Sequence, residues 1–389
     1  MRFTWGATYA LFWIYRSIFS FLGQTIVLRL TSVPDTAGYQ AFGYSQLGGL
    51  LAGGPGIVET GPLMQQNATM ITQIVGGVFH ILFGGNAVLI NIGFQSVAFV
   101  GLVYLLQGLE SARTRAFVLL LAMTPSFTVW SSIASKEAIV VFLCCVLARY
   151  VVDIHHNRDR LTFLRFAALS LTLGVLYIFK PHFLPAFLFV IGTSKIARHV
   201  RQPATITLLS AAASIFALYL VRDRVDQFAR LVSGWVSVEP GNSSRAEAFI
   251  VHQYEVFTKA PEGMLRAFVG PTWNEAAEGG LALISYIESV GILVALAIFV
   301  AWRLPRMPVY SATIALFTLF WTMFANYPLG VMNPGTAVRY RTDYIVLIFL
   351  AVAVLTSRDM YVRWRTGESR RKGKPSPRVA AFRPATARA

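Results

Sequence analysis

Charge is scarce in this chain, and its scarcity excludes an ordinary soluble domain. Only 13% of the 389 residues are charged and 55% are hydrophobic, whereas soluble domains carry about 25% charged residues. The sequence also lacks a Walker phosphate loop, a G-x-S-x-G elbow and an HExxH motif. With no ATP site, any reaction must draw on an activated substrate or on a gradient.

Cysteine is nearly absent as well. The two that exist, Cys144 and Cys145, are adjacent within an apolar stretch. Neighbouring residues on a helix face different sides, so neither a disulfide between them nor a shared metal site is expected.

Apolar stretches long enough to cross about 30 Å of hydrocarbon recur along the chain. The alternating ten-residue segments of a membrane barrel are not visible. We therefore predict an all-α, polytopic transmembrane helical bundle forming one integral membrane domain over residues 1–357. Ten spans are expected, at about 6–28, 86–106, 115–133, 138–153, 163–179, 183–197, 204–221, 279–302, 308–326 and 343–357.

Positive charge marks every second predicted loop and accumulates after the last span, in a basic tail at 358–389 that we expect to be disordered. Basic segments beside a span are retained in the cytoplasm, so both termini are predicted inside. The net charge of +16 then follows from topology. Membrane lipids are expected partners, because anionic headgroups attract such tails, and a nucleic acid is not.

Two predicted outer loops are long. The first, about 29–85, ends in the apolar stretch Met70–Phe83, which is short for a span. We expect a helix in the outer interface there; if it crossed, the N-terminus would lie outside. The second, about 222–278, is polar with an amphipathic portion around Phe249–Phe268, and is expected to form a small helical cap.

Asp35 follows the first predicted span in a Pro-Asp-Thr sequence. A carboxylate at this depth can act as a general base on a hydroxyl or can hold a divalent cation, which is the only cofactor that the sequence suggests. Alternatively, Pro-Asp simply forms a turn. Tyr39 nearby would add an aromatic platform for a sugar.

Two predicted outer turns carry cations at the same membrane level. Lys136 and Glu137 follow a hydroxyl-rich helix, which is typical of a helix that faces a bundle interior or a cavity. Lys180 and His182 occupy the next outer turn. Lys136, Lys180 or His182 could contact a phosphate; the plainer alternatives are that Lys136 snorkels to the interface and that His182 is a satisfied interface histidine.

The last outer turn runs from Asn333 to Arg339 and Arg341. Guanidinium groups bind phosphate oxygens bidentately, and residues two apart point differently unless the backbone bends. At least one arginine is therefore expected to face a cavity. The alternative is structural, with Asp343 as a salt-bridge partner.

Three further residues are candidates in the second half of the chain. Trp273 and Glu275 end the predicted cap, where the indole can anchor at the interface or stack on a sugar. Glu288 lies inside a predicted span, where a carboxylate is costly unless paired or protonated. Pairing with an outer arginine and proton coupling both remain open for it.

These motifs resemble those of bacterial polytopic glycan-assembly enzymes, namely the C-type superfamily of membrane glycosyltransferases and the repeat-unit polysaccharide polymerases. The resemblance rests on Asp35, Pro125-Ser-x-x-x-Trp130-Ser-Ser-x-x-x-Lys136-Glu137, Lys180-Pro-His182, Gly270-Pro-x-x-Trp273-x-Glu275 and Asn333-x-Gly-Thr-x-x-Arg339-x-Arg341. It implies a multi-pass protein of the bacterial inner membrane that acts on a polyprenyl-(di)phosphate-linked glycan at the outer face. Exopolysaccharide or O-antigen assembly, beside other assembly proteins, would be its context.

Within this resemblance Asp35 matches the acidic catalytic residue of C-type transferases. Many members have two adjacent acids at this place, whereas Thr36 follows here. That departure leaves room for a polymerase that relies on its outer arginines. A transporter or flippase for lipid-linked glycans is the alternative from another class, and it predicts polar residues through the bilayer depth and an inverted repeat.

The predicted topology can be tested by cysteine labelling from outside the cell. We expect an impermeant reagent to label an Asn242→Cys variant and to miss a Ser369→Cys variant, because basic segments stay in the cytoplasm. Labelling of both variants, or of Ser369→Cys alone, would contradict the topology.

Overall fold

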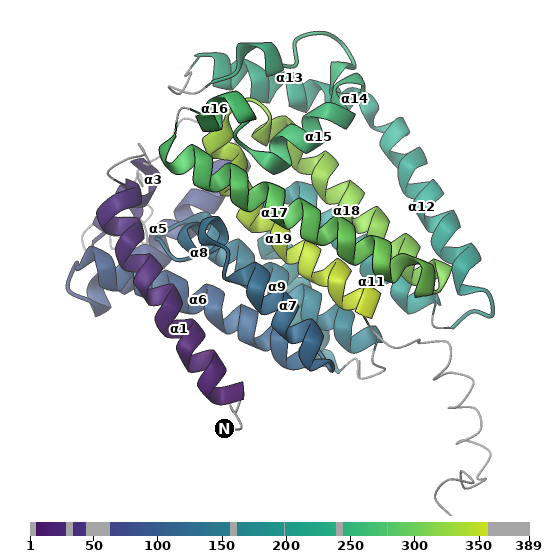
Figure 1. Cartoon of the computed structure of the whole chain (residues 1–389), viewed down its shortest axis with the longest axis horizontal. Coiled ribbons are helices and arrows are strands. Elements are labelled where there is room, and N and C mark those ends of the chain that lie inside the picture. The colour runs from purple at the N-terminus through teal and green to yellow at the C-terminus, as the bar shows by residue number, and fades with distance from the viewer. Residues whose placement is uncertain are drawn as a thin grey trace, which may run out of the picture.

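The computed structural model describes residues 5–28, 34–43, 63–155, 162–197, 199–238, 244–277 and 279–356. This part of the chain is helical and contains no strand, which confirms the all-α prediction (Figure 1). The first half holds α1 (Trp5–Leu22) with its π-helical continuation (Gly23–Val27), α3 (Pro34–Ala41), α5 (Leu63–Leu82), α6 (Ala87–Gly108), α7 (Ala112–Ala122), α8 (Pro125–Trp130), α9 (Lys136–His155), α10 (Phe163–Phe179) and α11 (Leu184–Ala197). The second half holds α12 (Pro203–Leu220), α13 (Arg222–Val238), α14 (Glu255–Thr258), α15 (Ala260–Val269), α16 (Trp273–Ala277), α17 (Gly280–Arg303), α18 (Val309–Gly330) and α19 (Pro334–Thr356).

Six described helices are long and apolar enough to cross a membrane, which supports the prediction of a membrane protein. They are α1 with its continuation, α6, α9, α12, α17 and α18. The other four predicted spans also contain helices, but α7, α10 and α11 are shorter and α19 carries charged residues near its start. The total of ten spans therefore stays a prediction.

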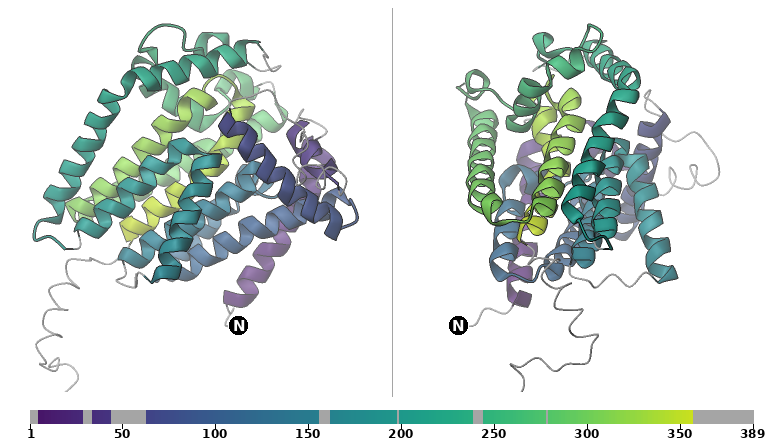
Figure 2. Two further views of the ribbon diagram at one scale, coloured as in Figure 1. Left: turned by 180° about the vertical axis from the view of Figure 1, so that it is seen from behind. Right: turned by 90° about the vertical axis from the view of Figure 1, so that its right-hand side faces the viewer.

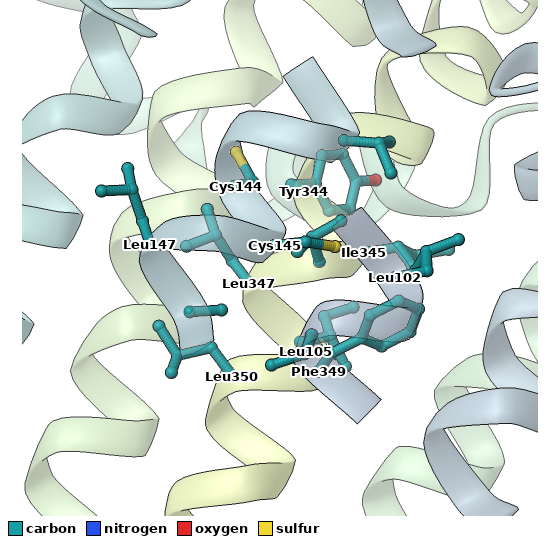
Figure 3. Close-up of a cluster of buried hydrophobic side chains, with 14 of the residues drawn as sticks. Leu102, Leu105, Cys144, Cys145, Leu147, Tyr344, Ile345, Leu347, Phe349 and Leu350 are labelled. Atoms are coloured by element: carbon teal, nitrogen blue, oxygen red, sulfur yellow. The ribbon is translucent and has the colours of Figure 1, made fainter. Parts of the chain in front are cut away.

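The core of the bundle is built around α9, on which both α6 and α19 pack (Figure 3). Gly101 permits the close approach of α6 to α9, because a Cβ there would lie 2.8 Å from the Cα of Phe142. Cys144 and Cys145 are free and buried, and their sulfurs point in different directions. By contrast, α12 and α17 leave large apolar side chains exposed, as expected for lipid-facing helices.

The predicted span 115–133 is not one continuous helix, which corrects the sequence analysis. Helix α7 ends at Ala122, Thr124 has extended backbone, and α8 starts at Pro125. Proline has no N–H to continue the helix and disfavours helical backbone in the residue before it. After Trp130 the chain again leaves the helix, and the turns over 131–135 are fully buried before α9 begins.

Buried irregular backbone must find hydrogen bonds inside the protein, and in this bundle side chains from other helices supply them. Arg16 Nη2 donates to the carbonyl and the hydroxyl of Ser131, both at 2.9 Å. Asn91 Oδ1 accepts from the Ala134 N–H at 2.8 Å. Helices α1 and α6 thereby hold the segment between α8 and α9, which we name the buried turn, in a fixed conformation.

The described parts of the two long loops of the sequence analysis contain helices. Residues Met70–Leu82 belong to the 20-residue helix α5, which packs against α3, α6, α9 and α10. The expected helical character of 222–278 is confirmed by α13 to α16, which lie together at one end of the bundle (Figures 1 and 2).

A set of cations stacked on aromatic rings lies at the opposite end of the bundle. Such pairs are typical of a membrane–water interface, where aromatic rings and basic groups both concentrate. We name this set the aromatic–cation belt. It comprises Arg115 over Trp5 at 5.1 Å, Arg149 over Tyr104 at 5.2 Å, Lys195 over Tyr150 at 5.5 Å and Arg306 over Trp302 at 5.2 Å.

Removal of the Asn91 amide should destabilise the bundle, because Asn91 also accepts from Gln40 and donates to Gln24. In Asn91→Ala the buried Ala134 N–H loses its acceptor, and each such orphaned group costs about 1–3 kcal/mol. We expect a lower unfolding temperature in detergent for Asn91→Ala and little change for Asn274→Ala, whose side chain is exposed. Equal unfolding temperatures for the two variants would contradict the role of Asn91.

Candidate functional site

Five charged residues from four parts of the chain converge at the end of the bundle opposite the aromatic–cation belt. Helix α9 shows how far apart the two ends lie: Lys136 at its start and Arg149 of the aromatic–cation belt are separated by about 20 Å along the helix, at 1.5 Å per residue. We name this group the α19 charge cluster. Its members are Asp35 of α3, Glu137 of α9, Lys180 after α10, and Arg339 and Asp343 of α19.

Arg339 is the centre of the cluster because two carboxylates share its guanidinium. Its Nε donates to Glu137 Oε1 at 2.7 Å, and Nη2 lies 3.4 Å from Glu137 Oε2. Both terminal nitrogens lie 3.3 Å from Asp35 Oδ2. Glu137 is 1% exposed, whereas Asp35 is 27% exposed. The guanidinium therefore has one edge sealed inside the protein and one edge turned toward a partly accessible carboxylate.

Lys180 and Asp343 form a second, fully enclosed ion pair. Their atoms Nζ and Oδ2 are 2.8 Å apart, and the ammonium also lies 3.8 Å from the centre of the Tyr340 ring. The partner of Asp343 is thus a lysine, and not one of the arginines of the same turn. A buried ion pair of this kind leaves neither charge uncompensated.

The cluster is close to neutral. Three carboxylates face two cations, and the half-buried Lys136 beside Glu137 adds a third positive charge at the same end of α9. Such an arrangement does not need an anion to be stable.

Arg341 points away from Arg339, as expected for residues two apart on a helix. Its guanidinium is fully buried, bonds to Ser126 at 2.8 Å and lies 3.3 Å from Glu288 Oε1. It also contacts Ser289. Of the two interpretations open for Glu288, pairing with an arginine is therefore the one that the structure contains. This pair links α8, α17 and α19 below the charge cluster.

Three other predicted site residues make local contacts in the fold. His182 packs its ring on Phe183 at 4.8 Å, close to Lys180 in sequence. Asn333 accepts from the Thr336 N–H at 3.0 Å and so caps α19. Tyr39 is buried on α3, and Gly76 of α5 packs closely against its backbone carbonyl.

Trp273 and Glu275 lie on α16, and their surroundings differ. Trp273 is 64% exposed, with Tyr286 beside it at 5.7 Å. Glu275 accepts from the Thr272 N–H at 2.6 Å, and Thr272 accepts in return. This reciprocal capping box has the signature Thr-x-x-Glu, a signal already present in the sequence. The described contacts of Glu275 are therefore structural.

Arg245 closes this corner of the cap. It is buried, forms an ion pair with Glu275, and donates to the carbonyls of Val331 and Gly270. Partial burial opposes ionisation of Glu275, but hydrogen bonds from Arg245 and Thr272 hold the pKa of its carboxyl below the usual value. The contribution of this clasp to stability is thus full at neutral pH and is lost as the pH falls through that lowered pKa.

Sequence reasoning missed two buried arginines. Arg16 interrupts the apolar run of the first span, and an ionisable residue at that position was the available signal. Arg245 sits in a polar loop and gave no signal, because only the fold brings Gly270 and Glu275 to it.

Within the described residues, no three His, Cys, Asp or Glu side chains converge as metal ligands. A cation held by Asp35 stays a prediction. Comparisons of the chain with protein-family models, with curated proteins and with solved structures found no match.

The pairing of Arg339 with Glu137 can be measured by a double-mutant cycle. Arg339→Gln leaves the Glu137 carboxylate buried without its charged partner, and breaking a buried pair in this way costs about 3–5 kcal/mol. The double variant Arg339→Gln/Glu137→Gln should recover part of that loss, because no unpaired charge remains. We expect this non-additivity in unfolding free energies measured in detergent. Strictly additive losses would show that the two side chains do not interact.

Proposed function

We propose that this protein is a membrane glycosyltransferase or polysaccharide polymerase. It transfers sugar units from a polyprenyl-(di)phosphate carrier at the outer face of the bacterial inner membrane. In this proposal the chain has ten spans with both termini in the cytoplasm, and the α19 charge cluster lies on the outer side. The reaction needs no ATP, because the carrier phosphate is already an activated leaving group.

The observation that carries the proposal is the shared guanidinium of Arg339. Its inner edge is held by Glu137 at 2.7 Å, while its terminal nitrogens face the partly exposed Asp35 at 3.3 Å. A phosphate accepts two parallel N–H bonds from such an edge, and a diphosphate carries two negative charges where a carboxylate carries one. The donor phosphate would therefore replace Asp35 on Arg339, and Glu137 would keep the guanidinium in place.

Once the donor phosphate has displaced Asp35 from Arg339, Asp35 can act as the general base. The freed carboxylate accepts the proton of the acceptor hydroxyl as that oxygen forms a bond with the anomeric carbon. The bond between this carbon and the phosphate oxygen breaks, and the polyprenyl (di)phosphate leaves with the bonding electrons. Arg339 stabilises the negative charge on the leaving group, and Lys136 adds a second cation at the same end of α9.

Sugar recognition would fall to the exposed aromatic surface of the cap. Trp273 is the most accessible of the predicted sugar-site residues, and an indole face stacks on the apolar face of a sugar ring. Lys180 and Asp343 would not contact substrate in this scheme. Their enclosed pair fixes the start of α19 and hence the position of Arg339.

A transporter or flippase for lipid-linked glycans is the second candidate, and one observation favours it. The break between α7 and α8, followed by the buried turn, resembles the discontinuous helices that form transporter sites. Arg16 and the Arg341–Glu288 pair lie beside this segment. Purified protein in vesicles separates the two functions: a flippase moves labelled lipid-linked glycan intact, whereas a transferase breaks its sugar–phosphate bond.

Asp35 gives the sharpest test of the transferase. Asp35→Asn keeps the size of the side chain and removes the base, and general-base catalysis contributes about 10²–10⁴-fold. We expect turnover from a polyprenyl-linked donor to fall by that factor in purified protein, with an almost unchanged unfolding temperature.

The matched control is Glu262→Gln, which removes one carboxylate from the exposed surface of α15. Its turnover should equal that of the wild type. Full turnover in Asp35→Asn would exclude Asp35 from the mechanism and would favour a polymerase that relies on arginines.

A further inference from the structure

A cavity of about 790 Å³ opens at the end of the bundle that carries the aromatic–cation belt, far from the α19 charge cluster. Its size is within the range of small-molecule sites. The first turns of α7 and the end of α17 line it, together with the last turn of α19. The lining residues are Leu109, Glu110, Ser111, Arg113, Thr114, Phe117, Phe299, Trp302, Arg303, Val352, Ala353 and Thr356.

Two arginines give the cavity its charge. Arg113 forms no hydrogen bond or ion pair within the described part of the chain, and it lies in the first turn of α7. A cation is unfavourable at that place, because a helix N-terminus is itself positive, whereas an anion would interact well with both. Arg303 donates to the Leu355 carbonyl through Nε alone, at 3.0 Å, and so its terminal nitrogens have no acceptor among the described residues.

The cavity is preformed by contacts that do not use these free donors. Arg115 Nε donates to the Leu109 carbonyl at 2.7 Å and fixes the loop before α7. Phe117 and Phe299 stack at 5.1 Å with an angle of 14°, and they join α7 to α17. The single carboxylate of the lining, Glu110, is exposed and already engaged in an interaction of its own.

We propose that this cavity binds an anionic phospholipid, with the headgroup phosphate between Arg113 and Arg303. The apolar lining of Phe299 and Trp302 would take the start of an acyl chain. This site is independent of the proposed transferase activity, and it would connect α7, α17 and α19 through one lipid.

A phospholipid fits better than a soluble anion for two reasons. The cavity lies at the level of the aromatic–cation belt, where headgroups are found, and Trp302 is 56% exposed on the lipid-facing side of α17. In addition, ten Lys and Arg follow Thr356 in the sequence. Such basic segments concentrate anionic lipids around the protein and so raise the occupancy of a nearby site.

Fluorescence quenching of Trp302 tests the proposal with the full chain in phosphatidylcholine vesicles. A small, fixed fraction of either brominated phosphatidylglycerol or brominated phosphatidylcholine is added. The contribution of Trp302 is obtained as the difference between wild type and Trp302→Phe. We expect brominated phosphatidylglycerol to quench Trp302 at a lower mole fraction than brominated phosphatidylcholine does, by about fivefold for each arginine that contacts the headgroup.

Two variants distinguish a site from diffuse attraction. Arg113→Gln/Arg303→Gln should abolish the preference for phosphatidylglycerol. Arg306→Gln, which removes a charge at the same end but outside the lining, should keep it. Arg113→Gln alone breaks no described contact, and so a partial loss in this variant remains interpretable if the double variant unfolds.

Three results would overturn the proposal. Equal quenching by both lipids would show that the cavity has no preference for an anionic lipid. An equal loss in Arg306→Gln would assign the preference to general surface charge. Abolition of the preference by added inorganic phosphate, at constant ionic strength, would identify a site for a soluble anion instead.

Discussion

A charge inside an apolar bundle is costly unless it is paired, and such pairs are concentrated on helix α19. Its first turns carry Arg339, Arg341 and Asp343, and each reaches a partner on a different element. Loss of a single partner would leave a buried charge unpaired, which is far more costly than loss of an exposed pair. The position of α19 relative to α9, α17 and the turn at Lys180 is therefore fixed by electrostatics as well as by packing.

The same constraint explains the polar residues deeper in the bundle. The buried turn between α8 and α9 has backbone groups that no helix satisfies, and Arg16 and Asn91 supply the hydrogen bonds. The turn ends at Lys136 and Glu137, so its conformation sets where Glu137 meets Arg339. The site and its support thus form one polar chain that runs from α1 to α19.

Much of the architecture could be predicted from the sequence because hydropathy and helix length are local properties. Each predicted span contains helix, and the pairing of Glu288 with an arginine is one of the two alternatives that the sequence leaves open. Local pattern failed where a proline interrupts an apolar run, since Thr124-Pro125 divides a span that hydropathy presents as continuous. The proline itself imposes this break, and hydrogen bonds from Arg16 and Asn91 hold the buried turn that follows α8.

The candidate site was predictable in its members but not in its pairings. Asp35, Glu137 and Arg339 are distant in sequence, and only the fold, in which α9 packs on α19 and α3 packs on α5, makes them neighbours. The sequence leaves open a phosphate for Lys180 and an arginine for Asp343, and the structure pairs these two residues with each other. Glu275 could have been assigned to a capping box from Thr272-x-x-Glu, but its contact with Arg245 depends on the fold.

The central claim is that Asp35 and a substrate phosphate compete for the same edge of Arg339. Equilibrium binding of a polyprenyl diphosphate to purified protein tests this most directly, with wild type compared to Asp35→Asn. Competition predicts tighter binding in Asp35→Asn, by about tenfold if one charge-assisted contact of roughly 1.4 kcal/mol is released. Unchanged or weaker binding in Asp35→Asn would contradict the account.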